Sequence, residues 1–126
     1  MDKQDLKERT KNFALRVIRL VQSLPKTDVG RVIGNQLLRS GTAVAANYRA
    51  ACRARSKSEF IAKIGIVVEE SDESCFWMEM IIDAPLLKKS LVENLYNEAK
   101  EITAIMYSTR NSAIKNKKSW FLFFIP

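Results

Sequence analysis

Residues 36–60 place several hydrogen-bonding side chains inside a segment that otherwise has the composition of an apolar helix. The polar members are Gln36, Arg39, Ser40, Thr42 and Asn47. A polar group on a packing face is costly unless it forms a hydrogen bond. We therefore expect this helix to lie against another helix, another subunit or a ligand that supplies the partners, which favours a fold of packed helices.

Few residues interrupt helix formation along the chain. Its 126 residues include 4 glycines and 3 prolines, which favours a few long helices over many short strands. Apolar residues recur with a period near 3.6 in four segments. The predicted helices cover residues 5–24, 28–53, the segment from Ser56 to 82, and 87–112. Their short connections predict an all-α, antiparallel up-down-up-down four-helix bundle.

Local sequence features mark the helix ends. Pro25 ends the first helix, because the residue before a proline avoids helical angles. Thr27 is a suitable N-cap for the second helix. Ser56 and Glu59 form an S-x-x-E capping box for the third, and Pro85 separates it from the fourth.

The repeating apolar positions predict the core. They are Leu6, Phe13, Val17, Leu20 and Leu24 in the first helix, and Val29, Val32, Ile33, Leu37, Val44 and Tyr48 in the second. The third and fourth helices contribute Phe60, Ile64, Val67, Val68, Cys75, Met78, Ile82, Leu91, Leu95, Ala99, Ile102, Ile105 and Met106. Gly30, Gly34 and Gly41 each cost a helix up to about 1 kcal/mol against alanine. They therefore predict that another helix approaches the second one closely.

The chain reads as one domain over residues 1–118, followed by an apolar tail at 119–126. The tail is too short to cross a bilayer, and it either packs on protein or extends freely. The charged N-terminus does not resemble a signal peptide. Cys52 and Cys75 fit buried thiols of a reduced protein better than a disulfide scaffold, so we expect a cytoplasmic location and no membrane contact.

The net charge of +7 is unevenly distributed. Residues 1–63 carry a net charge of +9, residues 64–83 carry −6, and residues 84–126 carry +4. One interpretation is a basic surface for a polyanion such as RNA, and the other is pairing of the acidic helix with basic helices of this or another copy. The candidate phosphate contacts are Arg16, Arg19, Arg49, Arg53, Arg55 and Lys57. Tyr48, beside the last four, is either a core residue or a base-stacking platform.

Antiparallel pairing of the second and third helices brings Arg39 within reach of Glu70 or Glu73. An arginine–carboxylate fork is strong and directional, and it fixes the register of two helices. The residues predicted to form a structural polar network are Gln36, Arg39, Ser40, Asn47, Glu70 and Glu73. The other interpretation is a ligand or RNA site that uses Arg39. Trp77 lies on the same acidic stripe and is either a subunit-interface residue or a core residue.

The composition argues against an enzyme. The chain has no histidine, which removes Ser-His and Cys-His nucleophilic sites and the Glu-x-x-His motifs of dinuclear metal bundles. The acidic residues crowd on one predicted helix, so we expect no metal site. The glycine spacing matches no phosphate-cradling loop, and we expect no cofactor and no catalytic residue.

Three segments resemble a bacterial family of four-helix bundle proteins, also known as ribosomal RNA intervening-sequence proteins. They are RTKNFALRVIRLVQSLPKT at 9–27, QLLRSGTAVAANYRAACRARSKSEFIAKIGI at 36–66, and EESDESCFWMEMI at 69–81. The resemblance places these residues on recurrent family positions: Gln36, Arg39, Ser40, Asn47, Tyr48, Ser56, Phe60, Lys63, Glu70, Glu73 and Trp77. Ala50 stands where the family often has glutamate, so any salt bridge made by that glutamate is absent here. The apolar tail also differs from the family's usual ending.

The resemblance implies a homopentameric ring of antiparallel bundles. It also implies similarity to the accessory protein of diversity-generating retroelements, which binds nucleic acid and a reverse transcriptase through a basic surface. Together with the charge distribution, this leads us to expect a non-enzymatic oligomer that binds nucleic acid, most readily RNA. The alternative is a protein-interaction scaffold or accessory subunit without direct nucleic-acid contact.

Overall fold

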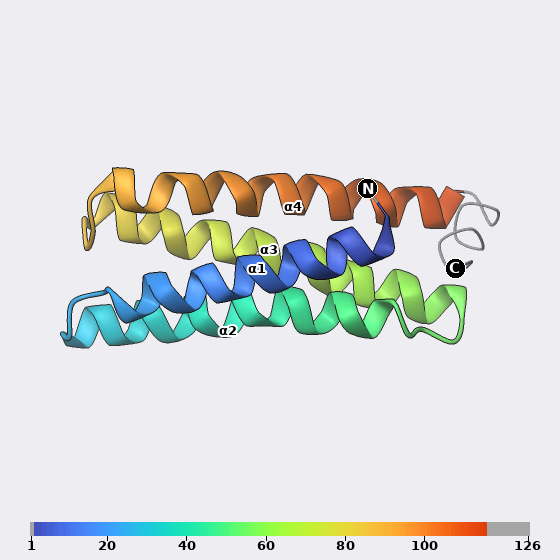
Figure 1. Ribbon diagram of the computed structural model, residues 1–126, viewed down its shortest axis with the longest axis horizontal. Coiled ribbons are helices and arrows are strands. Elements are labelled where there is room, and N and C mark those ends of the chain that lie inside the picture. Colours follow the sequence, from blue (N-terminus) through green and yellow to red (C-terminus); the bar gives the residue numbers. More distant parts are fainter. Residues whose placement is uncertain (1, 116–126) are drawn as a thin grey trace.

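A computed structural model describes residues 2–115 of the chain. It contains four helices: α1 (Lys3–Gln22), α2 (Asp28–Ala51), α3 (Lys57–Asp83) and α4 (Lys89–Lys115) (Figure 1). No strand occurs among the described residues, so the prediction of an all-α, four-helix fold is confirmed. The predicted apolar tail at 119–126, and the last three residues of the predicted domain before it, lie outside the described part.

The helix starts follow the predicted caps. The Thr27 hydroxyl accepts a hydrogen bond from the backbone N–H of Gly30 at 3.1 Å, and the Ser56 hydroxyl accepts one from Glu59 at 3.1 Å. The Glu59 carboxylate accepts in turn from the backbone N–H of Arg55 at 3.4 Å. These bonds use N–H groups that have no partner inside the first helical turn, so the caps fix where α2 and α3 begin.

Successive helices run in opposite directions along the long axis of the molecule (Figure 1). The pairs α1–α2, α2–α3 and α3–α4 pack side by side, and a smaller contact between α1 and α4 closes the bundle. The helices α1 and α3 are not neighbours, so they lie diagonally across the bundle. This placement gives α1 and α3 outer surfaces that face opposite sides.

The core runs the length of the bundle and takes residues from all four helices. Its largest fully buried side chains are Tyr48, Phe13, Phe60, Leu37, Ile64, Met78, Ile81, Ile102, Met106, Val17, Val44 and Val67. Most of the predicted core positions are among the buried residues, as a 3.6-residue period requires of helices that bury one face.

Three predicted core positions are wrong. Val29, Val32 and Leu91 are 54%, 62% and 63% exposed. Val29 and Leu91 lie next to residues that are buried instead, Gly30 and Val92, and Val32 lies next to Ile33, which is buried as predicted. Neighbouring residues of a helix point about 100° apart, so a small error in the rotation of a helix exchanges them. Val68, Ile82 and Ile105 are partly buried and pack against the core.

The predicted close approach to α2 occurs at Gly41. A Cβ atom added there would lie 2.8 Å from both methyl groups of Val17 on α1. The bulk of Val17 therefore fills the space that a side chain at Gly41 would need.

We expect Gly41→Ala to destabilise the protein. Overpacking costs about 1–3 kcal/mol, and the higher helix propensity of alanine offsets up to about 1 kcal/mol of that. Chemical denaturation should therefore show a net loss of up to about 2 kcal/mol. In a double-mutant cycle, Gly41→Ala combined with Val17→Ala should lose less stability than the two single losses added together. Strict additivity would show that the two residues do not touch.

No helix within residues 2–115 combines the length and the apolar character that crossing a membrane requires.

Candidate nucleic-acid interface

A groove lies between the N-terminal half of α1 and the C-terminal half of α2. Its volume is about 340 Å³, and it is lined by Gln4, Lys7, Lys11, Ala45, Ala46, Arg49 and Arg53. The two halves meet at the end of the bundle that holds the N-terminus (Figure 1). The alanines contribute little side-chain volume, so the long cationic side chains form the walls of this basic groove.

The four cations of the basic groove have no ionic partner among the described residues. The side chains of Lys7, Lys11, Arg49 and Arg53 form neither an ion pair nor a hydrogen bond within residues 2–115. No carboxylate lines the groove. The groove is therefore an unneutralised concentration of positive charge, which attracts anions.

Two acidic residues near the start of α1 bind groups other than the groove cations. Asp2 caps α1 by accepting a hydrogen bond from the backbone N–H of Asp5 at 2.8 Å. The Glu8 carboxylate accepts a hydrogen bond at 3.5 Å from the side chain of Gln4, which lines the groove. Glu8 thus lies beside the groove lining without forming an ion pair with its cations.

The spacing of the groove cations follows from helix geometry. Lys7 and Lys11 are four residues apart on α1 and so lie on the same face about one turn apart, while Arg49 lies in the last turn of α2 and Arg53 in the turn that follows it. Because α1 and α2 pack side by side in opposite directions, the two pairs face each other across the groove. Sequence analysis singled out Arg49 and Arg53 but missed Lys7 and Lys11. The sequence shows that Lys7 and Lys11 share one face of a helix, but it does not show which helix packs beside that face.

The other predicted phosphate contacts lie outside the groove. Arg16 follows Arg9 by two helical turns and so shares its side of α1, where Arg9 forms an ion pair with Glu98 on α4 at 2.7 Å. Arg19 is exposed one turn further on. The structure does not bring these two arginines together with Arg49 and Arg53.

Arg55 and Lys57 lie at the connection from α2 to α3, at the same end of the bundle as the groove. Arg55 is exposed, and its guanidinium forms no ion pair within residues 2–115. The Lys57 ammonium is directed toward α4 and donates to the carbonyl oxygen of Ile114 at 3.5 Å. Arg55 therefore extends the basic end of the bundle, while Lys57 is engaged by the last turn of α4.

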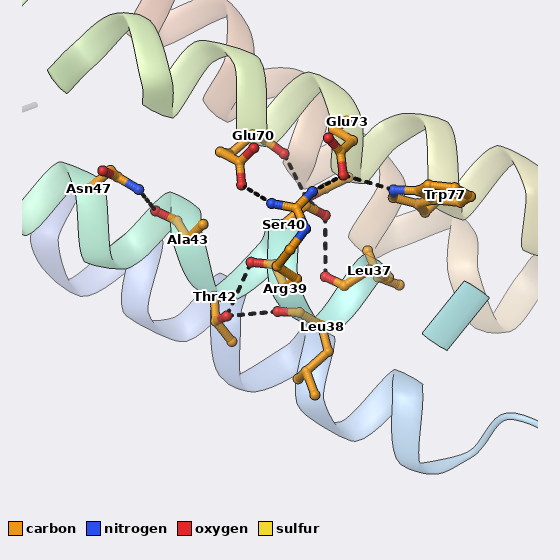
Figure 2. A network of polar contacts seen from close by, with 11 residues as sticks. Leu37, Leu38, Arg39, Ser40, Thr42, Ala43, Asn47, Glu70, Glu73 and Trp77 are labelled. Atoms are coloured by element: carbon orange, nitrogen blue, oxygen red, sulfur yellow. Dashed lines mark hydrogen bonds and ion pairs between the residues drawn. The ribbon is translucent and has the colours of Figure 1, made fainter. Parts of the chain in front are cut away.

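A second polar cluster joins α2 to α3 (Figure 2). Arg39 donates to Glu70 at 2.7 Å and also pairs with Glu73. The Glu73 carboxylate accepts a second hydrogen bond, at 3.0 Å, from the indole N–H of Trp77. One guanidinium thus bridges two carboxylates on successive turns of α3, which fixes the register of the two helices.

Small hydroxyl side chains continue this cluster into the core. The Ser40 and Ser74 hydroxyls lie 2.9 Å apart, and both residues are fully buried. The Thr103 hydroxyl donates to that of Ser71 at 2.8 Å and links α3 to α4. Sequence analysis did not identify Ser71, Ser74 or Thr103, although the two serines occupy core-facing positions of α3.

Two predicted members of the polar network do not join it. The Asn47 side chain donates to the backbone oxygen of Ala43, one turn earlier in its own helix, at 2.9 Å. Gln36 is half-buried, and its side chain has no hydrogen bond within residues 2–115. A side chain satisfied by the i−4 carbonyl of its own helix does not need a partner on a neighbouring helix.

The titratable groups buried in the bundle are not activated. Burial raises the pKa of the Cys75 thiol to about 11, with a further contribution from Asp72. Burial also raises the pKa of Cys52 and of Tyr48. A reactive cysteine needs a lowered pKa, so both thiols stay protonated at neutral pH and act as small core residues. No group of three or more potential metal ligands occurs among residues 2–115.

Comparison with known proteins identifies a matching family and a similar solved structure. A model of the family described as 23S rRNA-intervening sequence protein matches residues 2–108. The fold is similar to the crystal structure of a protein with unknown function from the S23 ribosomal protein family from Bacteroides thetaiotaomicron. The TM-score is 0.81 and the identity 31%, over 88% of this chain and 99% of that chain. No curated protein matches the chain.

The family match covers α1, α2, α3 and most of α4, and so includes both the basic groove and the Arg39 cluster. The solved structure has the same fold over nearly its full length. The family match confirms the resemblance to ribosomal RNA intervening-sequence proteins that sequence analysis found in residues 9–81. The chain belongs to the 23S rRNA-intervening sequence protein family.

Proposed function

We propose that the protein is a non-enzymatic nucleic-acid-binding protein that holds RNA in the basic groove. The observation that carries this proposal is the convergence of Lys7, Lys11, Arg49 and Arg53 on one groove without a carboxylate among its lining residues. Cations that are not neutralised inside the protein are available to phosphates, and phosphate contacts supply most non-specific nucleic-acid affinity. The family description names an intervening sequence of 23S rRNA and no ligand, and RNA is the polyanion that the experiment below tests.

The lining of the groove favours contacts to the sugar-phosphate backbone over contacts to bases. No aromatic residue lines it, and Tyr48, the aromatic residue nearest in sequence, is fully buried. Sequence-specific RNA recognition depends largely on bases stacked on aromatic or arginine planes and hydrogen-bonded at their edges. A groove of this kind supports binding with weak sequence selectivity.

Three further properties belong to the proposal. The raised pKa values of both thiols support a protein without catalytic cysteines. Free, buried Cys52 and Cys75 suit the reducing cytoplasm. The family resemblance supports self-association of antiparallel bundles into a ring of five and a protein partner such as a reverse transcriptase.

The test is fluorescence anisotropy with nuclease-treated protein and labelled RNA strands of equal length. We expect affinities for unrelated sequences to agree within about threefold, because phosphates carry no sequence information. Affinity should fall steeply as salt is raised, because binding releases counterions. Absence of binding at low salt would contradict the proposal and leave the scaffold alternative.

A further inference from the structure

The outer surface of α3 carries large apolar side chains exposed to solvent. Phe76 is 49% exposed, Met80 39% and Ile66 37%, and all three come from this one helix. The half-buried Trp77 stacks edge-on against Phe76, with ring centroids 4.9 Å apart. A helix with apolar residues on its outer side as well as its inner side is typically covered on both sides.

The same surface is acidic. Residues 64–83 contain six acidic and no basic side chains. Glu69 and Asp72 are exposed and form no ion pair within residues 2–115. Glu70 and Glu73 share the single cation Arg39, so that cluster keeps a negative charge. A partner for this surface must therefore offer both apolar contact and positive charge.

The outer surface of α1 has this chemistry. Residues 9–27 contain no acidic side chain. Leu15 is 39% exposed, and the neighbouring Arg16 and Arg19 form no ion pair within residues 2–115. Neither arginine is among the residues that line the basic groove.

The positions of the two surfaces decide how copies can meet. Contact between two α3 surfaces would set acids against acids, which is unfavourable across an interface. Because α1 and α3 lie diagonally across the bundle, one copy presents the acidic apolar surface on one side and the basic surface on the other. Contacts between two different surfaces repeat head to tail and generate rings or filaments.

We infer that the α3 surface around Phe76 and Met80 binds the α1 surface around Leu15, Arg16 and Arg19 of a second copy of this chain. The inference rests on the proposed self-association and names the surfaces that perform it. Phe76, Met80 and Leu15 supply the apolar contact, and Glu69 and Asp72 meet the arginines. Each copy then uses two different interfaces, which leaves the basic groove open.

Light scattering on nuclease-treated protein tests the inference with two variants. Phe76→Ser/Met80→Ser removes the apolar side chains of the α3 surface. Arg16→Glu/Arg19→Glu reverses the charge of the α1 surface. We expect the wild type to form an oligomer and each variant to have the mass of one chain. An equimolar mixture should have the mass of two chains, because one intact surface remains on each variant and the complex cannot grow further.

Circular dichroism should show wild-type helix content in both variants, because Phe76, Met80 and Arg19 are exposed and Arg16 is only half-buried. Wild-type mass in either variant, a monomeric wild type, or a mixture that stays monomeric would each overturn the inference. Lys7→Glu/Lys11→Glu is the matched control, since it reverses two charges in the groove and should keep the oligomer. Loss of RNA binding in that control, with the oligomer intact, separates the proposed RNA function from the assembly.

Discussion

Leu37→Ala is expected to destabilise the protein by about 2–5 kcal/mol, the range for removing a leucine side chain from a packed core. Leu37 is fully buried in α2, at the level where α2 meets α1 and α3. The substitution loses the burial of the side chain and leaves a cavity that the long helices cannot easily collapse. Denaturation by urea, followed by circular dichroism, measures the loss.

Leu91→Ala is the matched control for this prediction. Leu91 is 63% exposed in the first turn of α4, so the same substitution should change stability by no more than about 0.5 kcal/mol. The comparison also tests the rotation of α4, since the apolar period places Leu91 in the core as readily as Val92. Equal losses at the two positions would show that the helix is rotated from its position in the structure.

The largest effect on RNA affinity is expected from neutralising the basic groove. Lys11→Gln/Arg49→Gln removes one cation from each wall without changing side-chain length greatly. Each phosphate contact contributes about 0.7 to 0.9 to the slope of log affinity against log salt. Two lost contacts therefore correspond to about a 25- to 60-fold weaker affinity near 0.1 M salt. Fluorescence anisotropy with a fixed RNA strand measures the change.

The control removes the same charge from the far end of the bundle. Lys88→Gln/Lys89→Gln lies at the connection from α3 to α4, opposite the groove in Figure 1. At about 0.1 M salt, charges separated by more than roughly 10 Å are largely screened. We expect less than about a threefold loss of affinity in this variant. Equal losses in the two variants would mean that net charge, and not the groove, determines binding.

The sequence predicted the helices and one tertiary contact well because both depend on local rules. Thr27 and Ser56 cap their helices through side chains only three residues from the groups they bind. Arg39 reaches Glu70 and Glu73 because a short connection between antiparallel helices sets which turns lie side by side.

The basic groove could not be predicted in the same way. Lys7 and Lys11 belong to α1, while Arg49 lies in the last turn of α2 and Arg53 just after it, about forty residues later along the chain. Which helix faces which depends on how α1 and α2 rotate about their axes, and this rotation is set by contacts such as Val17 against Gly41. The same uncertainty in rotation misplaced Val29, Val32 and Leu91. Arg16 and Arg19, which sequence analysis grouped with Arg49 and Arg53, do not line the groove.

The salt dependence of RNA affinity tests most directly the claim that four unpaired cations hold phosphates in the groove. For a single strand that contacts all four, the slope of log affinity against log salt should be about −2.8 in the wild type. In the variant Lys7→Gln/Lys11→Gln/Arg49→Gln/Arg53→Gln it should approach zero. A wild-type slope near zero, or an unchanged slope in the variant, would contradict the account.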